Sequence, residues 1–503
     1  MTEAAESTRA SGNLGVAAVR GFAWNYGAVL AGKLCFFAAT LVLARQLDAT
    51  DFGLVAFTLA VLTYVETVTS HGIGETLVYR RDAHDDAVAS TAFWLSIATS
   101  IVLTAALWLL APAIARLGPN DASLVLVVRI ISLQLAFSAI GSTHRYLLRH
   151  SMSFDRIFGP QLLSGLAKGV VAVALALSGF GIWSLVLAQV ASMLLRSVGF
   201  WVVSDWRPRL VFARSKARSI VTTGSGFAAI AIIGGAARNA DYLIIGIGLG
   251  STALGYYYLA FRLPELLVLG PFESVWQVLF PYYARLHDTE LDHERALRSV
   301  EHGFRESVRL GSLVALPLCA ASAALASPIV HTLYGDTWNP AVVPFALISL
   351  WAGTAAVSGM AGVVLKSLGR AASLTTATTV STLVRLPILW FATLGGISGV
   401  AGAQLVAQVL WLLAIFAVVA SVLRVRMLAV LAPLVPSLLV SAVVGACALV
   451  SARTLPPQPG LAAGVAVAAL SYAIMLRLVC ADALQVGLET LRAAWPRRRA
   501  FTW

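Results

Sequence analysis

Charged side chains interrupt several long apolar runs of this sequence. The cations that stand inside such runs and have the chemistry to bind an anion are Lys33, Lys168, Arg238, Arg262 and Arg385. A cation at membrane depth is costly unless an anion, an acceptor or water meets it. Lys33, Lys168 and Arg385 have no acidic neighbour at helical spacing, so the sequence predicts that they face a hydrated cavity attracting phosphate or acidic sugar.

Carboxylates and amides occur in the same apolar setting. Asp241 and Glu265 are candidate ion-coupling sites, because low-dielectric surroundings can make a carboxyl group titrate near neutral pH. They also follow Arg238 and Arg262 by three residues, so in an alternative interpretation each pair neutralises itself on one helix face. The amides that would line the cavity are Asn25 and Asn239.

Patterns typical of enzymes are missing from the sequence. It has no phosphate-binding glycine loop with Lys and Ser/Thr and no paired-histidine zinc helix, and "GIGLG" at Gly246 lies in an apolar run. The four cysteines stand singly, without metal or redox spacing. The sequence therefore predicts no catalytic residue, metal or cofactor.

Composition restricts the class of protein. The chain has 503 residues, of which 59% are hydrophobic and 12% charged, and its mean hydropathy is +0.83. That leaves too little polar surface for a water-soluble globule of this size, so the sequence indicates an all-α polytopic membrane protein. The net charge of +12 is spread in small groups between apolar runs, which favours a topology signal over nucleic-acid binding.

A membrane-spanning helix needs about 20 mostly apolar residues. Fourteen such runs are predicted, at 18–46, 52–76, 88–115, 123–147, 157–178, 181–203, 219–248, 253–282, 307–333, 341–366, 372–394, 397–423, 428–451 and 460–480. Every second loop is basic; Arg145, Arg149 and Arg156 are counted in one of these loops. The positive-inside rule then places both termini in the cytoplasm, which requires an even number of crossings.

The longest loop, 284–309, has mixed charge. Glu294 with Arg298 and Glu301 with Arg305 have the acid-first i, i+4 order that stabilises a solvated helix. We therefore expect one of the flanking helices to extend into the cytoplasm here.

An internal repeat predicts the architecture. "LDATDFGLVAFTLA" from Leu47 aligns without gaps with "LGSTALGYYYLAFR" from Leu249, and two further pairs of segments align in the same order. We expect two parallel copies of six helices, at 18–210 and 216–425, related by a pseudo-two-fold axis along the membrane normal. An extra helix pair at 428–480 follows, with cytoplasmic tails at 1–17 and 481–503.

Several segments together resemble one transporter family. "LARQLDATDFGLVA", "STAFWLSI", "DWRPRLVF", "RNADYLIIGIGLGSTALGYYYLAFRL" and "YGDTWNPAVVPF" are similar to Wzx-type polysaccharide transporters of the multidrug/oligosaccharidyl-lipid/polysaccharide (MOP) flippase superfamily. The resemblance implies a flippase in the bacterial plasma membrane that moves undecaprenyl-diphosphate-linked oligosaccharides outward for lipopolysaccharide, exopolysaccharide or capsule synthesis. It also implies two lobes around a cationic cavity.

Alternatives remain open at this point. A lipid II flippase or a cation-coupled drug antiporter of the same superfamily is one alternative, and a membrane-embedded glycan polymerase or ligase, disfavoured by the short outer loops, is another. Expected partners are the lipid-linked oligosaccharide and membrane lipids, with a polymerase and glycosyltransferases as further candidates. Tyr334 and Trp338 are expected at the outer edge, as an aromatic belt or as a platform for sugar stacking.

Overall fold

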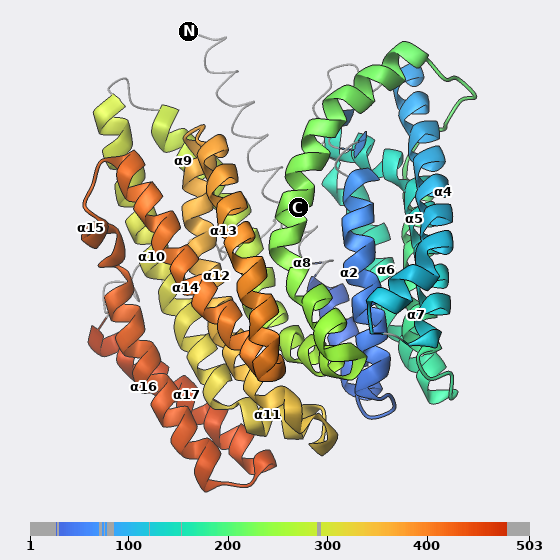
Figure 1. Ribbon diagram of the computed structural model, residues 1–503. Helices are drawn as coiled ribbons and strands as arrows, with labels where there is room; N and C mark the ends of the chain where they lie inside the picture. Colours follow the sequence, from blue (N-terminus) through green and yellow to red (C-terminus); the bar gives the residue numbers. More distant parts are fainter. Residues whose placement is uncertain are drawn as a thin grey trace, which may run out of the picture. The chain divides into compact units, whose positions relative to one another are not determined.

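The computed structural model describes residues 27, 30–69, 73–74, 76–77, 85–119, 121–151, 153–288 and 293–479. All regular structure in these ranges is helical (Figure 1), and eleven helices are long and apolar enough to cross a membrane. This confirms an all-α, multi-pass membrane protein.

The chain divides into two compact units. Unit 1 comprises Met1–Leu259 and Thr378–Val400, and unit 2 comprises Ala260–Ala377 and Ala401–Trp503. These bounds differ from those of the predicted six-helix copies, which stay a prediction.

Unit 1 contains a short apolar helix, Leu30–Leu43, and five long helices. These are α2 (Ala49–Thr69), α4 (Asp86–Leu117), α5 (Ala122–His150), α6 (Phe154–Leu177) and α7 (Trp183–Val203). Helix α4 packs on α5, while α7 packs on both α5 and α6 (Figure 1). The first part of α8 (Arg214–Pro264) follows, and Gly250, with a φ of 88°, interrupts its helical backbone.

Unit 2 contains the helices that follow the end of α8. They are η2 (Glu265–Leu269), α9 (Gly270–Asp288), α10 (His293–Ala324), α11 (Ala326–Leu333), η3 (Asp336–Ala341), α12 (Val342–Ser367), α15 (Met427–Leu431), α16 (Leu434–Thr454) and α17 (Pro457–Val479). Helix α10 packs against both α12 and α16, and α16 against α17. The two remaining helices are α13 (Ala371–Ala392) and α14 (Gly396–Leu423), with η4 (Thr393–Gly395) between them. A boundary between the units falls within each of these two helices, so each contributes residues to both units.

The core of unit 2 is apolar and closely packed. Phe304 of α10 and Phe416 of α14 are fully buried, with ring centroids 5.6 Å apart. Small residues on α12, such as Ala352 and Ala356, allow neighbouring helices to approach closely, as is common where lipid supplies no hydrophobic driving force. Each of the fourteen predicted runs overlaps a described helix, but the number of crossings itself stays a prediction.

Helix α10 confirms the helix and the ion pairs that the mixed-charge loop predicts, while its extension into the cytoplasm stays a prediction. It begins at His293, and both acid-first pairs form at 3.4 Å, Arg298 with Glu294 and Arg305 with Glu301. A helix of 32 residues is about 48 Å long, well beyond the roughly 30 Å of hydrocarbon, so one end extends out of the hydrocarbon.

The two aligned repeat segments meet within unit 1. The hydroxyl oxygens of Thr50 and Thr252, which the alignment pairs, lie 2.8 Å apart. A Cβ added at Gly53 would meet the carbonyl oxygen of Ser251, and one added at the equivalent Gly255 would meet that of Ala49. Each half of the contact repeats the other with the same shift of 202 residues that aligns the sequences, so this local packing has pseudo-two-fold symmetry.

Candidate functional site

Lys33 and Lys168 lie at one helix crossing in unit 1. Gly32 of the first apolar helix meets Gly165 of α6 backbone to backbone, because neither residue has a Cβ. One turn further along α6, the Lys168 ammonium lies 4.0 Å from the centroid of the Phe36 ring. Phe36 follows Lys33 by three residues and shares its helix face. The structure thus brings two half-buried lysines to adjoining faces of two packed helices.

Asp241 lies in a polar cluster with two aromatic residues and an arginine. Its side chain is fully buried; the Tyr257 hydroxyl donates to Oδ2 at 2.8 Å, and the Tyr242 amide donates to Oδ1 at 3.0 Å. The rings of Tyr242 and Tyr257 meet edge-on, with centroids 5.8 Å apart. Arg385 of α13 interacts electrostatically with Tyr257. The structure therefore brings Arg385 within electrostatic range of the Tyr257 hydroxyl that donates to Asp241.

Arg262 and Glu265 form an ion pair at the end of α8. Arg262 Nη1 lies 2.9 Å from Glu265 Oε2, and both side chains are partly exposed. The self-neutralising interpretation therefore describes this pair. In the other predicted pair, Asp241 accepts a hydrogen bond from Tyr257, while the side chain of Arg238 lies outside the described residues, so that pairing stays a prediction.

Two further predicted residues have simple placements. Asn239 is partly buried, one turn before Tyr242 on α8, while Asn25 lies outside the described residues. The expectation for Tyr334 and Trp338 is wrong: each is 1% exposed, and their rings pack together with centroids 6.5 Å apart. The short η3 turn folds this pair into unit 2, so neither ring reaches sugar or the membrane interface.

A small polar cavity lies between α2, α4 and α5 in unit 1. It has a volume of about 20 Å³, enough for about one water molecule. Its polar lining consists of Glu66, Ser96, Ser100, Ser138, Ser142, Arg145 and Tyr146. The charge pattern groups Arg145 with the basic loop that includes Arg149 and Arg156. In the structure it lies within α5, and its guanidinium donates to the Tyr146 hydroxyl at 3.0 Å.

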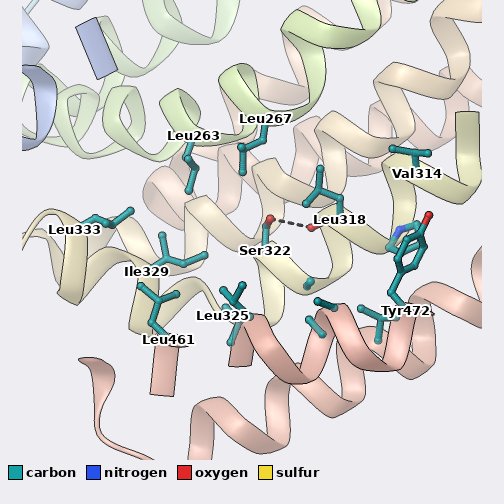
Figure 2. Close-up of a pocket in the computed structure, with 16 residues that line it drawn as sticks. Leu263, Leu267, Val314, Leu318, Ser322, Leu325, Ile329, Leu333, Leu461 and Tyr472 are labelled. Carbon is teal, nitrogen blue, oxygen red and sulfur yellow. Dashed lines mark hydrogen bonds between the residues drawn. The ribbon is translucent and has the colours of Figure 1, made fainter. Parts of the chain in front are cut away.

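A larger groove lies in unit 2 between α10, α11, α16 and α17 (Figure 2). Its volume is about 530 Å³, and nearly all of its lining is aliphatic, including Leu263, Leu318, Leu325 and Leu461. Ser322 is one of its few polar residues, and its hydroxyl donates a hydrogen bond to the Leu318 carbonyl oxygen at 2.8 Å (Figure 2). The groove suits a hydrocarbon chain and offers almost no hydrogen bonds to a polar ligand.

Sequence reasoning missed the partners that define these sites. Tyr257 stands inside the aligned repeat, four residues after the expected span boundary at 253, and nothing in its spacing pointed to Asp241. Phe36 is one of many apolar residues around Lys33. Gly165 and Gly169 on α6 were a usable signal, since small residues at four-residue spacing favour close helix contact.

Comparisons with known proteins identify relatives. A family model described as "Polysaccharide biosynthesis protein" matches residues 42–343. The succinoglycan biosynthesis transport protein ExoT of Rhizobium meliloti is 29% identical over 342 residues, covering 67% of each chain. The teichuronic acid biosynthesis protein TuaB of Bacillus subtilis is 25% identical over 311 residues, covering 61% of this chain and 62% of TuaB. The lipopolysaccharide biosynthesis protein WzxC of Escherichia coli is 23% identical over 317 residues, covering 60% of each chain.

Solved structures share the fold. The lipid II flippase MurJ, in an inward closed conformation, matches with a TM-score of 0.72 at 14% identity, over 89% of this chain and 98% of MurJ. An inward-facing multidrug resistance transporter of the MATE family in the MOP superfamily matches with a TM-score of 0.61 at 15% identity, over 78% and 95% of the two chains. At these identities the likeness concerns the fold.

Proposed function

Because the chain belongs to the family of polysaccharide biosynthesis proteins whose model it matches, we propose that it is a flippase for undecaprenyl-diphosphate-linked oligosaccharide repeat units. It moves them across the bacterial plasma membrane during the synthesis of a surface polysaccharide, and it acts as a transporter without catalytic residues. The match confirms the family resemblance of the sequence. The aligned regions span two thirds or less of the related proteins, so the cargo is inferred from this chain's own chemistry as well.

The observation that carries the proposal is the paired lysines of unit 1. Lys33 and Lys168 are partly buried at one crossing of two apolar helices. Both side chains lie on adjoining faces of the two helices, so their positive charges favour the binding of an anion beside this crossing. A diphosphate has the charge and the oxygen acceptors for this, and Arg385 adds a third cation to the same unit. Arg238 and Arg262 stay further predicted cations for binding the cargo.

The groove of unit 2 fits the other end of the cargo. A polyprenyl chain is apolar along its length, and the aliphatic lining of the groove matches it (Figure 2). Because lipid is itself apolar, a chain that leaves the bilayer for the groove is held by van der Waals packing against this lining and not by removal from water. The predicted extra helix pair supplies one wall through α16 and α17, which gives these two helices a role in binding lipid.

Asp241 is the proposed site of ion coupling, with Glu265 as a second candidate. A fully buried carboxylate that accepts hydrogen bonds at both oxygens is sensitive to protonation or to cation binding. Transport proceeds by alternating access between two parallel copies, with both termini in the cytoplasm.

The test removes the cations and measures export. The variant Lys168→Gln/Arg385→Gln is expected to abolish surface polysaccharide in a strain that depends on this chain, while the protein is still inserted at normal amounts. The matched control is Lys366→Gln/Arg370→Gln, which removes two cations from the α12–α13 connection and should export normally. Unchanged export by the first variant would remove the cationic site from the mechanism.

A second candidate is a lipid II flippase, favoured by the fold similarity to MurJ. Its cargo carries the same diphosphate and polyprenyl groups, so the cations serve either cargo. Rescue of a strain depleted of its own lipid II flippase would establish this function. A growth assay with cationic dyes distinguishes a flippase from a cation-coupled drug antiporter. We expect no resistance to the dyes, because a predominantly positive site is unfavourable for a cationic drug.

A further inference from the structure

An extended segment links α7 to α8 and is fastened to the start of α4. We call residues 204–213 the strap. The Arg209 amide donates to Ser90 Oγ at 3.0 Å, and the Arg209 carbonyl accepts from the Trp94 indole at 2.8 Å. Further along, the Ala213 amide donates to Thr91 Oγ1 at 3.0 Å. These bonds hold the strap along the first turns of α4.

The exposure of α4 indicates the depth of the strap. The first turns of α4, from Val88 to Phe93, are buried, whereas Val102 and Leu109 are 65% and 81% exposed on the part of the helix that suits lipid. Helix α4 has 32 residues and is about 48 Å long, so about 18 Å of it extends beyond a hydrocarbon layer of about 30 Å. Trp94, near the start, is a residue type enriched at the membrane–water boundary. The strap therefore lies at the boundary.

Three consecutive apolar side chains of the strap are exposed. Leu210 is 91% exposed, Phe212 53% and Val211 43%. A run of this kind on a connecting segment is unfavourable in water, whereas it is favourable against the acyl chains beneath the headgroups.

The residues around this apolar run are basic. From residue 204 to 218 the cations are Arg207, Arg209, Arg214, Lys216 and Arg218, against one acid, Asp205. Asp205 is paired with Arg156 of α6, whose guanidinium donates to the carboxylate at 2.7 Å and lowers the pKa of that carboxyl. The one acid of this segment therefore stays ionised, and its charge is balanced by a residue outside the strap. Arg214 and Arg218, one turn apart at the start of α8, are exposed. Arg209 forms an ion pair with Asp86 of α4 at 2.9 Å, and the remaining cations of residues 204–218 still outnumber the one acid.

We propose that the strap and the first turn of α8 form a binding surface for anionic phospholipids of the cytoplasmic leaflet. Leu210, Val211 and Phe212 insert among the acyl chains, while Arg214, Lys216 and Arg218 bind the lipid phosphates. Apolar insertion and basic attraction together are the two signals that stable interfacial binding requires. Because the strap joins the two predicted six-helix copies, this lipid contact holds their connection at the membrane surface.

The first experiment measures insertion in the full-length protein. A nitroxide is attached to Val211→Cys, and in a second sample to Glu294→Cys, in a background with the four native cysteines replaced. In liposomes of phosphatidylcholine and phosphatidylglycerol, the label at 211 should be more accessible to oxygen than to a water-soluble nickel chelate. The label at 294, on the charged face of α10, should show the reverse. Equal access of the chelate to both labels would overturn the insertion of the strap.

The second experiment measures the charge preference. The triple variant Arg214→Gln/Lys216→Gln/Arg218→Gln should lose at least roughly tenfold in preference for phosphatidylglycerol over phosphatidylcholine, measured as lipid retained by purified protein, since each surface cation contributes several-fold. The matched control Arg298→Gln/Arg305→Gln, from α10, should keep the wild-type preference. An unchanged preference in the triple variant, with an unchanged melting temperature, would rule out anionic lipid as the ligand.

Discussion

The symmetric contact between the repeat segments predicts a large penalty for one added methyl group. In Gly53→Ala an ideal Cβ would lie 1.8 Å from the Ser251 carbonyl oxygen, and in Gly255→Ala one would lie 1.7 Å from that of Ala49. Real Cβ atoms essentially never come within 3.0 Å of such an atom, so the two segments must separate by at least about 1.2 Å, from 3.0 minus 1.8. The obstacle is backbone and cannot rotate away.

The expected cost follows from overpacking. Inserting a methylene into a well-packed contact typically costs about 1–3 kcal/mol. Replacing a helical glycine by alanine returns roughly 0.5–1 kcal/mol through helix propensity, so each variant should be destabilised by up to about 2 kcal/mol. The double variant should cost less than the sum of the two, because one separation of the segments relieves both clashes.

The matched control is Gly402→Ala in α14. An added Cβ there meets only Leu347 Cδ1, at 4.0 Å, an ordinary van der Waals contact, so the substitution should be neutral or slightly stabilising. Thermal unfolding of the detergent-purified proteins, followed by size-exclusion chromatography, compares the three. If Gly53→Ala melted at or above the temperature of Gly402→Ala, the close symmetric packing would be refuted.

Three further predictions concern export, the stability of the Asp241–Tyr257 hydrogen bond and lipid binding. In a background without native cysteines, Thr50→Cys/Thr252→Cys should cross-link on oxidation and block export until reduced, because the two hydroxyls lie 2.8 Å apart; export by the fully cross-linked protein would show that this contact does not open. A double-mutant cycle of Asp241→Asn and Tyr257→Phe should give a coupling of about 1.5–3 kcal/mol in unfolding, the range for a hydrogen bond to a charged group, and additive effects would mean that the bond does not form. Ala468→Trp should fill the groove and lower retention of a polyprenyl phosphate by the purified protein, with retention at the wild-type level counting against the groove as its site.

Two residues show why the sequence predicts the surroundings of charged and aromatic side chains less well than it predicts the membrane-spanning segments. Arg145 looks like one of a series of loop bases, yet α5 continues to His150 and carries it into a polar cavity with Glu66. Tyr334 stands beside a Gly-Asp turn typical of a surface, yet η3 buries it against Trp338. Each outcome depends on how far a helix continues or where a turn folds back, and local composition does not encode that.

Local apolarity and patterns along one chain were enough to predict the membrane-spanning class, the approximate helix ranges and the family. They also offered Arg262 with Glu265 at i, i+3 as one interpretation, which the structure confirms. The placement of Lys168 over Phe36, and of Asp241 against Tyr257, required the tertiary structure. A buried charge is stabilised by whatever group lies within a few ångströms in space. For most of these residues that group is distant in sequence, and helix packing alone brings it near.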